Sequence, residues 1–256
     1  MDEHIIVGHT GFVGGVLQGQ RFTSQAFNST NFRDMRGVSA PLLVCAGVRA
    51  EKWKANAEPQ TDWNSIQNLW DVMRSVRAHR FVLISTVDVY PQPNLVDEGF
   101  RPHGLANHAY GQHRLALEEM VLANFPRAVV LRLPALFGPG LRKNVLFDMK
   151  NARLLDGINP DSSFQWYDVR RLWADIDLAL DVREGGIFNL VTRPISVRRL
   201  RDTLFPGLEI GAKASAPVSY DVRTLHAKTF GGTDGYLEDE DMVLQRMDHW
   251  LSSESA

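Results

Sequence analysis

Short apolar runs alternate with longer segments of helical periodicity through the first 140 residues of the chain. Most of these runs are rich in β-branched residues, which is typical of strands buried on both faces of a parallel sheet. The expected strands are HIIVG (4–8), SQAF (24–27), LLVCAG (42–47), FVLIST (81–86) and AVVLRLP (128–134).

The segments between these runs predict helices. GFVGGVLQGQ indicates a turn that enters a helix, and a further helix is expected from about Tyr110 to Asn124. Six apolar residues recur at helical spacing and predict a helix at about 61–78: Trp63, Ile66, Leu69, Trp70, Met73 and Val76. Strands and helices that alternate in this way favour an α/β fold, with a doubly wound parallel sheet covered on both faces.

Beyond Pro134 the pattern changes. FGPGLRKN indicates a loop, FQWYDVRRLWADIDLAL a short strand and a helix, and GIFNLVT another strand. ISVRRLRDTLF and EDEDMVLQRMDHWL predict two more helices, the second with acidic residues in its first turn. We therefore expect a core at 1–140 plus about 164–192, and a small C-terminal lobe at about 141–163 and 193–256.

Composition narrows the class of protein. The 256 residues are 44% hydrophobic and 23% charged, which is ordinary for a soluble globular protein. A net charge of −2 argues against a nucleic-acid partner or a polybasic membrane surface. The sequence has no apolar run of about 18 residues, and MDEHIIVGHT does not have the pattern of a signal peptide. A cytoplasmic protein without a membrane partner is expected.

Cysteine and histidine usage gives no sign of a metal. The one cysteine, Cys45, lies in the apolar run LLVCAG, where a buried thiol is expected rather than a nucleophile. The eight histidines show no HxxxH spacing, and CxxC is absent. We expect neither a structural nor a catalytic metal.

A glycine-rich segment follows the first expected strand. VGHTGFVGG places Gly8, Gly11 and Gly14 at the start of a helix with the spacing GxxGxxG. Glycines there permit a sharp turn, a close approach to a pyrophosphate and tight helix packing, and the helix N-terminus offers free N–H groups. The pattern predicts a Rossmann-type dinucleotide site; the alternative is an ordinary glycine-rich turn. The expected contacts are Gly8, Thr10, Gly11, Phe12, Val13 and Gly14.

The tip of the second expected strand bears on the choice of dinucleotide. An acidic residue there holds the adenosine ribose in many such proteins. This chain instead has the neutral residues Asn28, Ser29 and Thr30, followed by Arg33. Because such a tip does not repel a 2′-phosphate, NADP is favoured over NAD. The alternative is a tip that contacts only the adenine, or nothing.

Four stretches together resemble a known family: GHTGFVG, FVLISTVDVY, AYGQHR and LRLPALFGPG. The chain is similar to an extended short-chain dehydrogenase/reductase of the NAD-dependent epimerase/dehydratase family. The resemblance implies a Rossmann-type core, NADP or NAD as cofactor, and a small substrate lobe. It also implies an oxidoreductase or isomerase that acts on a nucleotide sugar or a related carbonyl or alcohol.

The resemblance assigns three catalytic residues. Thr86 would orient the substrate oxygen, and Tyr110 would move the proton as the acid/base. Arg114 stands where the family has lysine, on the same helical face as Tyr110. A phenol titrates near pH 10, so it needs a nearby cation to act near neutral pH, and arginine stays charged but does not relay protons. Alternatively, Arg114 is a solvated residue that pairs with Glu118.

Several further residues follow from the same resemblance. Ala46, Gly47 and Pro134 would contact the cofactor; the alternative for Ala46 and Gly47 is tight packing alone. Asp88 would serve as a base for the substrate or would fix the loop before Tyr90. Arg142 and Asn144 are expected substrate contacts, with solvent exposure as the alternative. Arg170 or Arg171 stands where relatives often carry an acidic residue, which would favour a negatively charged substrate or have no effect. The basic segment RAEKWKAN is a candidate lid over the cofactor, with solvent exposure as the alternative.

Two functions remain open at this point. One is an NAD(P)-dependent enzyme with a small-molecule substrate. The other is a non-catalytic dinucleotide-binding protein of the same fold, with a redox-sensing or structural function, which would keep the glycine loop and tolerate Arg114. The resemblance further implies a homodimer formed through the helices at 61–78 and 110–124.

Overall fold

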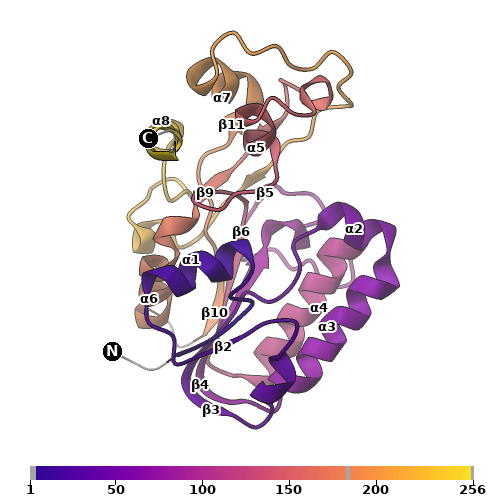
Figure 1. Ribbon diagram of the computed structural model, residues 1–256, viewed down its shortest axis with the longest axis vertical. Coiled ribbons are helices and arrows are strands. Elements are labelled where there is room, and N and C mark those ends of the chain that lie inside the picture. The colour runs from indigo at the N-terminus through magenta and orange to yellow at the C-terminus, as the bar shows by residue number, and fades with distance from the viewer. Residues whose placement is uncertain (1–3, 183–184, 255–256) are drawn as a thin grey trace. The chain divides into compact units, whose positions relative to one another are not determined.

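The computed structural model describes residues 4–182 and 185–254, which form two compact units. Unit 1 lies within residues 1–92, 100–132 and 172–188, and unit 2 within 93–99, 133–171 and 189–256. Figure 1 shows the elements of both in chain order. The functions that we assigned to the core and to the lobe stay predictions.

Unit 1 is built on a six-stranded sheet with the strand order β10-β6-β4-β3-β1-β2. The pairs β1–β2, β1–β3 and β3–β4 are parallel, with Ile5 opposite both Gln25 and Leu43. The strands are β1 (His4–Val7), β2 (Gln25–Phe27), β3 (Ser39–Cys45), β4 (Arg77–Thr86), β6 (Ala128–Leu133) and β10 (Gly186–Asn189). In this sheet, β2 lies next to β1 on one side and β3 lies next to β1 on the other, so the chain changes direction across the sheet after β2. In open α/β sheets, ligands bind outside the carboxyl ends of the strands at such a switch point.

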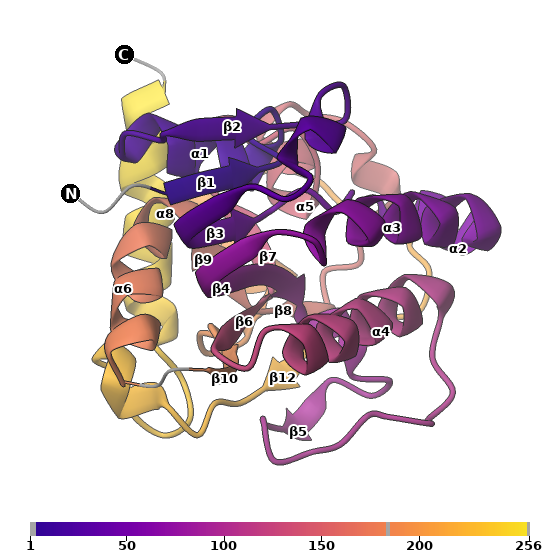
Figure 2. The same cartoon turned by 90° about the horizontal axis from the view of Figure 1, so that it is seen from below.

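Helices cover both faces of this sheet. Figure 2 shows α1 (Phe12–Gln20) and α6 (Leu172–Val182) on one face, and α3 (Pro59–Met73) and α4 (Ala109–Asn124) on the other. A short helix, α2 (Lys52–Ala57), leads into α3, and single 3-10 turns lie at Phe32–Met35 (η1) and Val87–Val89 (η2). The Rossmann-type doubly wound α/β fold predicted from the sequence is confirmed.

The core of unit 1 lies between the sheet and the helices α3 and α4. Alternate residues of the central strands enter it, as the two-residue period of a strand requires. Phe81 of β4 stacks on Phe125 with ring centroids 4.5 Å apart. The fully buried members include Ile5, Leu43, Cys45, Phe81, Met73, Val121 and Val130. Cys45 is therefore a core thiol, as the sequence indicated.

Unit 2 has small paired strands and three helices around its own core. Its strands are β5 (Asn94–Val96), β7 (Ala135–Phe137), β8 (Ser163–Phe164), β9 (Trp166–Asp168), β11 (Ile195–Ser196) and β12 (Asp221–Val222). Its helices are α5 (Val145–Lys150), α7 (Val197–Leu204) and α8 (Glu240–Glu254), with 3-10 turns at Leu155–Gly157 (η3), Val169–Arg171 (η4) and Ala227–Phe230 (η5). The core includes Phe137, Trp166, Ile195, Leu200 and Trp250.

Two expectations about secondary structure were wrong. The helix expected at 61–78 ends at Met73, and β4 begins at Arg77, four residues before the apolar run that predicted it. Val76 lies in the turn between them and packs into the core there. The basic segment after β3 contains α2, a helix that the periodicity did not predict. Across residues 4–182 and 185–254, no helix is both apolar and long enough to cross a bilayer.

Candidate active site

The glycine loop joins β1 to α1 in a tight turn. Gly8 has a φ of +89°, and a Cβ there would lie 2.4 Å from the carbonyl oxygen of Ala46. A Cβ on Gly14 would lie 2.2 Å from the carbonyl oxygen of Gly8. At the N-terminus of α1, Gly11 is the cap residue and makes no side-chain cap hydrogen bond. The loop therefore has the close packing and the uncapped N–H groups that a pyrophosphate requires.

Ala46 and Gly47 directly follow β3, beside this loop. Ala46 donates its backbone N–H to the carbonyl of Val7 at 2.9 Å, and a Cβ on Gly47 would lie 2.8 Å from the Val7 side chain. Tight packing therefore accounts for the glycine at position 47. The contact of Ala46 and Gly47 with a cofactor stays a prediction.

The tip after β2 is a closed turn with neutral side chains. The amide oxygen of Asn28 accepts hydrogen bonds from the backbone N–H and the hydroxyl of Thr30, at 2.8 and 2.7 Å. The side chain of Asn31 in turn accepts from the N–H of Asn28 at 2.7 Å. Ser29, Thr30 and Arg33 are exposed. No carboxylate side chain belongs to this turn at 28–31. The turn would therefore not repel the 2′-phosphate of NADP, and the preference for NADP over NAD stays a prediction.

The end of β4 presents Thr86 and Asp88. The hydroxyl oxygen of Thr86 accepts the backbone N–H of Asp88 at 3.1 Å and thereby caps η2. The carboxylate of Asp88 binds the ammonium of Lys52 on α2 at 2.7 Å. The alternative in which Asp88 only fixes its own loop is thus incomplete, because its side chain reaches a second element.

The first turn of α4 packs directly on this segment. Asn107 donates to the carbonyl of Asp88 at 2.9 Å, and a Cβ on Gly111 would lie 2.2 Å from the same carbonyl oxygen. His108 caps the helix through Nδ1, which accepts the N–H of Gly111 at 3.0 Å. In the neutral ring, the Nε2 atom then carries the proton and lies 4.0 Å from Asp88. These contacts fix the position of Tyr110, the second residue of the helix.

Arg114 does not lie in solvent. Its Nη1 and Nη2 atoms bind the two carboxylate oxygens of Asp62 on α3, with 2.9 Å between Nη2 and Oδ1. The Nη2 atom also donates to the carbonyl of Arg49 at 2.5 Å. The guanidinium carbon lies 3.9 Å from the ring centroid of Tyr110. The alternative in which Arg114 is solvated and pairs with Glu118 is therefore wrong.

The surroundings of Tyr110 set its acidity. Burial raises the pKa of the Tyr110 phenol above its usual value, and the charge of Arg114 opposes this effect without cancelling it. Asp88 raises the same pKa, whereas a hydrogen bond from Thr86 and the charge of Lys52 lower it. The side chain is only 7% exposed. Its neutral, proton-donating form is consequently the favoured one.

The carboxyl of Asp62 is stabilised in its charged form. Burial alone would raise its pKa, but hydrogen bonds from Arg114 and His113 lower it below the usual value of an aspartate. His113 contributes through Nδ1, 2.7 Å from Oδ2 of Asp62. Asp62 therefore stays negative at neutral pH and balances the charge of Arg114.

A second ion pair lies deeper on the same helix. Glu118 binds Arg132 of β6, and both side chains are at most 2% exposed. Ser85 donates its hydroxyl to Glu118 at 2.5 Å, and Arg132 donates to the hydroxyl of Tyr90 at 2.7 Å. The pair thus fixes α4 to β6, and the Ser85 hydrogen bond fixes it to β4, the strand that ends at Thr86.

Sequence reasoning missed the contacts of Lys52, Asp62 and His108, and it gave Glu118 the wrong partner. Tyr110, Arg114 and Glu118 follow one another at intervals of four residues, so one helical face with charged positions was visible in the sequence. Lys52 on α2 and Asp62 on α3 lie on other helices, and no spacing in the sequence relates them to Asp88 and Arg114.

The predicted contacts in unit 2 have mixed surroundings. Arg142 is exposed. Asn144 caps α5 by accepting the N–H of Phe147 at 3.0 Å, and it donates to the carbonyl of Leu136 at 2.8 Å. The amide of Asn144 is therefore used by the fold. The substrate contacts expected of Arg142 and Asn144, and the cofactor contact expected of Pro134, stay predictions.

Arg170 and Arg171 are both ion-paired within unit 2. Arg170 binds Asp168 at 2.7 Å, and Arg171 binds Glu238 at 2.6 Å. They line a shallow pocket of about 450 Å³. Because each has a carboxylate partner, the structure gives them a local role, and an effect on an anionic substrate stays a prediction.

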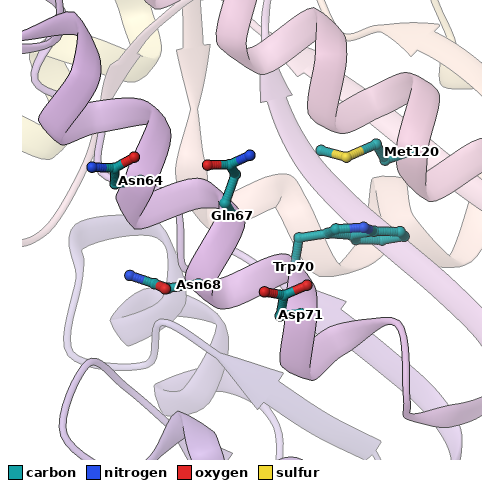
Figure 3. Close-up of a pocket in the computed structure, with 6 residues that line it drawn as sticks. All are labelled: Asn64, Gln67, Asn68, Trp70, Asp71 and Met120. Carbon is teal, nitrogen blue, oxygen red and sulfur yellow. The ribbon is translucent and has the colours of Figure 1, made fainter.

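Another pocket, of about 420 Å³, lies on α3 and α4, away from the predicted site residues. Figure 3 shows the amides of Asn64, Gln67 and Asn68 on α3, and Met120 of α4 beside Trp70. This lining is mostly polar, and the homodimer expected through these helices stays a prediction. Within residues 4–182 and 185–254, no three His, Cys, Asp or Glu side chains form a cluster that could hold a metal ion.

A comparison with protein families assigns the segment around Tyr110. Residues 42–162 match the model of the NAD dependent epimerase/dehydratase family. This segment belongs to that family. The matched residues include Thr86, Asp88, Tyr110 and Arg114, and the resemblance to the epimerase/dehydratase family is confirmed. The glycine loop precedes the match. No curated protein matches the chain by sequence.

Solved structures of epimerase/dehydratase type share the fold. RMD from Pseudomonas aeruginosa complexed with NADPH is 20% identical, with a TM-score of 0.73 over 98% of this chain and 97% of that one. The dTDP-4-dehydrorhamnose reductase from Bacillus anthracis in complex with NADP is 14% identical, with a TM-score of 0.73 over 98% of each chain. MoeE5 in complex with UDP-glucose and NAD is 19% identical, with a TM-score of 0.70 over 99% of this chain and 100% of that one. At these identities, the likeness concerns the fold alone.

Proposed function

We propose that the protein is an NAD(P)-dependent oxidoreductase or epimerase that acts on a nucleotide sugar or a related carbonyl or alcohol. The observation that carries this proposal is the arrangement of Thr86, Asp88 and Tyr110 at the carboxyl end of β4, in a segment that belongs to the epimerase/dehydratase family. Structural neighbours in complex with NADPH, NADP or NAD, and with UDP-glucose, support the class of cofactor and substrate.

The glycine loop is the place where a dinucleotide would bind. Gly8 and Gly14 leave no room for a Cβ, and the N-terminus of α1 offers N–H groups that its cap residue leaves without a side-chain acceptor. These features fit a pyrophosphate. A bound NAD(P) would supply or accept the hydride. The neutral turn at Asn28 favours NADP.

The chain's own residues would handle the proton and the substrate oxygen. Tyr110 would exchange its phenolic proton with that oxygen, because its burial keeps the phenol in the neutral form. Thr86 would orient the same oxygen. Arg114, bound to Asp62, would hold the ring of Tyr110 from one face rather than reach a ligand. Asp88 would face the substrate together with Lys52.

Two measurements test the proposal. The first is calorimetric titration of the purified protein with NADPH and with NADH at moderate salt. We expect binding of at least one, with NADPH preferred; no binding by a preparation free of copurified dinucleotide contradicts the proposal. The second is Tyr110→Phe, which should keep dinucleotide binding and lose turnover of a nucleotide-sugar substrate. If Tyr110→Phe behaves like the wild type in every assay, the catalytic role of Tyr110 is contradicted.

A further inference from the structure

Two cations influence Tyr110, and each is bound by a carboxylate: Arg114 by Asp62, and Lys52 by Asp88. We propose that Asp62 and Asp88 hold the local charge near zero, so that Tyr110 keeps its proton and the site reduces a carbonyl group rather than oxidises an alcohol. This inference rests on the proposed function and deepens it by naming the direction of the reaction. The substrate class that follows is a ketone or an aldehyde.

The Arg114–Asp62 pair is the first part of this balance. The carboxylate binds both terminal nitrogens of the guanidinium, and the two side chains are 5% and 10% exposed. A pair so far removed from solvent is weakly screened, and its field is that of a dipole rather than of a free cation. Arg114 consequently stabilises a tyrosinate less than an unpaired lysine at this position would.

The Lys52–Asp88 pair is the second part. Its N–O distance is 2.7 Å, and Asp88 is the more buried partner, with 17% of its side chain exposed against 39% for Lys52. His108 faces Asp88 but stays neutral, because its Nδ1 atom accepts the N–H of Gly111 and because burial and Lys52 lower its pKa. Water screens the exposed lysine more than the carboxylate, and the second pair therefore does not favour a negative phenol either.

The remaining polar groups that the structure describes around the ring add no free cation. His113 on α4 binds the same oxygen of Asp62 as Arg114 does, Oδ2. Thr86 is a neutral hydroxyl, and its hydrogen bond lowers the pKa of Tyr110 without cancelling the effect of burial. The backbone N–H of Tyr110 is held by the amide oxygen of Asn56 on α2 at 3.0 Å. The raised pKa of Tyr110, caused first by its burial, agrees with a phenol that keeps its proton.

The protonation state of Tyr110 sets which direction is faster at a given pH. To oxidise an alcohol, the residue must begin as a tyrosinate and take the hydroxyl proton, a state that a cation without a counter-ion favours. To reduce a carbonyl, it must begin as a phenol. In that case the carbonyl carbon gains the hydride that a reduced dinucleotide supplies, and the oxygen gains the proton of Tyr110. The tyrosinate left behind recovers a proton from water, so that the carbonyl is reduced and the dinucleotide is oxidised.

The test measures the ionisation of Tyr110 directly. We would label the five tyrosines with 13C at Cζ, assign Tyr110 from the signal lost in Tyr110→Phe, and follow its chemical shift with pH. In the wild type, we expect the phenol to be neutral at about pH 9 and its pKa to lie above the ordinary value of tyrosine, about 10, because the ring is buried. Ionisation of the wild-type residue below about pH 9 overturns the inference.

The cause is tested by removing the counter-ion. Asp62→Asn leaves Arg114 in place without its carboxylate, and it should lower the titration of Tyr110 by about one unit, a tenfold change in its ionisation constant. The matched control is Asp71→Asn, also on α3, where the carboxylate is exposed and pairs with Arg74. No shift in Asp62→Asn overturns the inference. If Asp62→Asn does not fold, Asp88→Asn makes the same comparison for Lys52.

These titrations need neither cofactor nor substrate, and their outcome is therefore independent of the proposed function. A protein that binds no dinucleotide contradicts the proposed function, whatever the tyrosine does. A protein that binds NADPH but ionises Tyr110 below about pH 9 contradicts the inference alone. With both results as expected, reduction of a keto sugar nucleotide should be faster at neutral pH than oxidation of the matching alcohol.

Discussion

Arg132 and Glu118 form a bidentate ion pair inside unit 1, with N–O distances of 3.1, 3.1 and 2.6 Å. The pair joins α4 to β6. Arg132 also donates a hydrogen bond to the hydroxyl of Tyr90, and Glu118 accepts one from the hydroxyl of Ser85. The position of Tyr110 relative to the sheet thus depends on a charged contact two turns further along the helix.

Removing one partner of this pair should destabilise the fold strongly. We expect Glu118→Gln or Arg132→Met to cost about 3–5 kcal/mol, because the remaining charge stays buried without a partner. The double replacement Glu118→Leu with Arg132→Met should cost less, about 1–3 kcal/mol, since only the hydrogen bonds of Ser85 and Tyr90 are then lost. Urea unfolding followed by tryptophan fluorescence measures both. A double variant less stable than either single one would contradict this account.

The close approach of Gly14 to Gly8 should make the loop intolerant of a methyl group. Gly14→Ala places a Cβ 2.2 Å from a carbonyl oxygen, and the loop must shift; we expect a loss of about 1–3 kcal/mol and of dinucleotide binding. The control is Gly19→Ala on the same helix, where a Cβ meets nothing within 4 Å. That variant should gain about 0.5–1 kcal/mol and bind normally. Calorimetric titration and thermal unfolding compare the two.

His108 should make the stability of unit 1 depend on pH. Burial, assisted by Lys52, lowers its pKa in the folded protein below the unfolded value of about 6.5. The unfolded chain therefore binds the proton more readily, so stability is complete above about pH 6.5 and is lost as the pH falls below it. Protonation of Nδ1 also removes the cap of α4.

The measurement for His108 is thermal unfolding at about pH 8 and about pH 5. His108→Asn keeps a capping oxygen that does not titrate, and its melting temperature should fall less between the two conditions than that of the wild type. His249→Asn, which replaces an exposed histidine of unit 2, should follow the wild type. An equal fall in His108→Asn and the wild type would show that His108 does not cause the dependence.

A carboxylate at the tip of β2 should change the choice of dinucleotide. Asn28→Asp keeps the oxygen that accepts from Thr30 and adds a negative charge. We expect NADPH to bind about tenfold more weakly, equivalent to about 1.4 kcal/mol, with NADH unaffected or improved. Titrations with both dinucleotides give the ratio. If the ratio does not change, the tip does not contact the 2′-position.

The regular parts of unit 1 could be predicted because their apolar residues repeat with the period of the element. The end of α3 could not: Val76 continues the helical spacing of Met73, yet the chain turns there, and both residues serve the same core. The first four residues of β4 were not predicted as a strand. Arg77, His79 and Arg80 are polar and lie at the more exposed end of β4, so they interrupt the apolar pattern. A six-residue helix such as α2, with Ala55 as its buried residue, carries too little periodicity to be recognised.

In the candidate site too, the sequence predicted what lies on one element and did not predict the contacts between elements. The sequence placed Arg114 on the face of Tyr110, because both lie on one helix with a known period. It did not indicate that Asp62, 52 residues earlier, would bind the guanidinium. Such a contact depends on how two helices pack on a sheet, and single-sequence patterns describe only neighbours along the chain. The assignment of Lys52 to Asp88 was hidden for the same reason.

The division of unit 1 among three stretches of the chain has a consequence for synthesis on the ribosome. When residue 133 has emerged, five of the six strands of the sheet have been synthesised. At that point β6, which is buried along its whole length in the finished fold, is an edge strand without its neighbour β10. The strand that covers this edge ends at Asn189, after 56 residues that follow β6. An apolar, unpaired edge is a template for association with other chains. Until β10 is synthesised, the nascent protein thus exposes an aggregation-prone strand edge. The rate of translation sets how long this edge stays exposed.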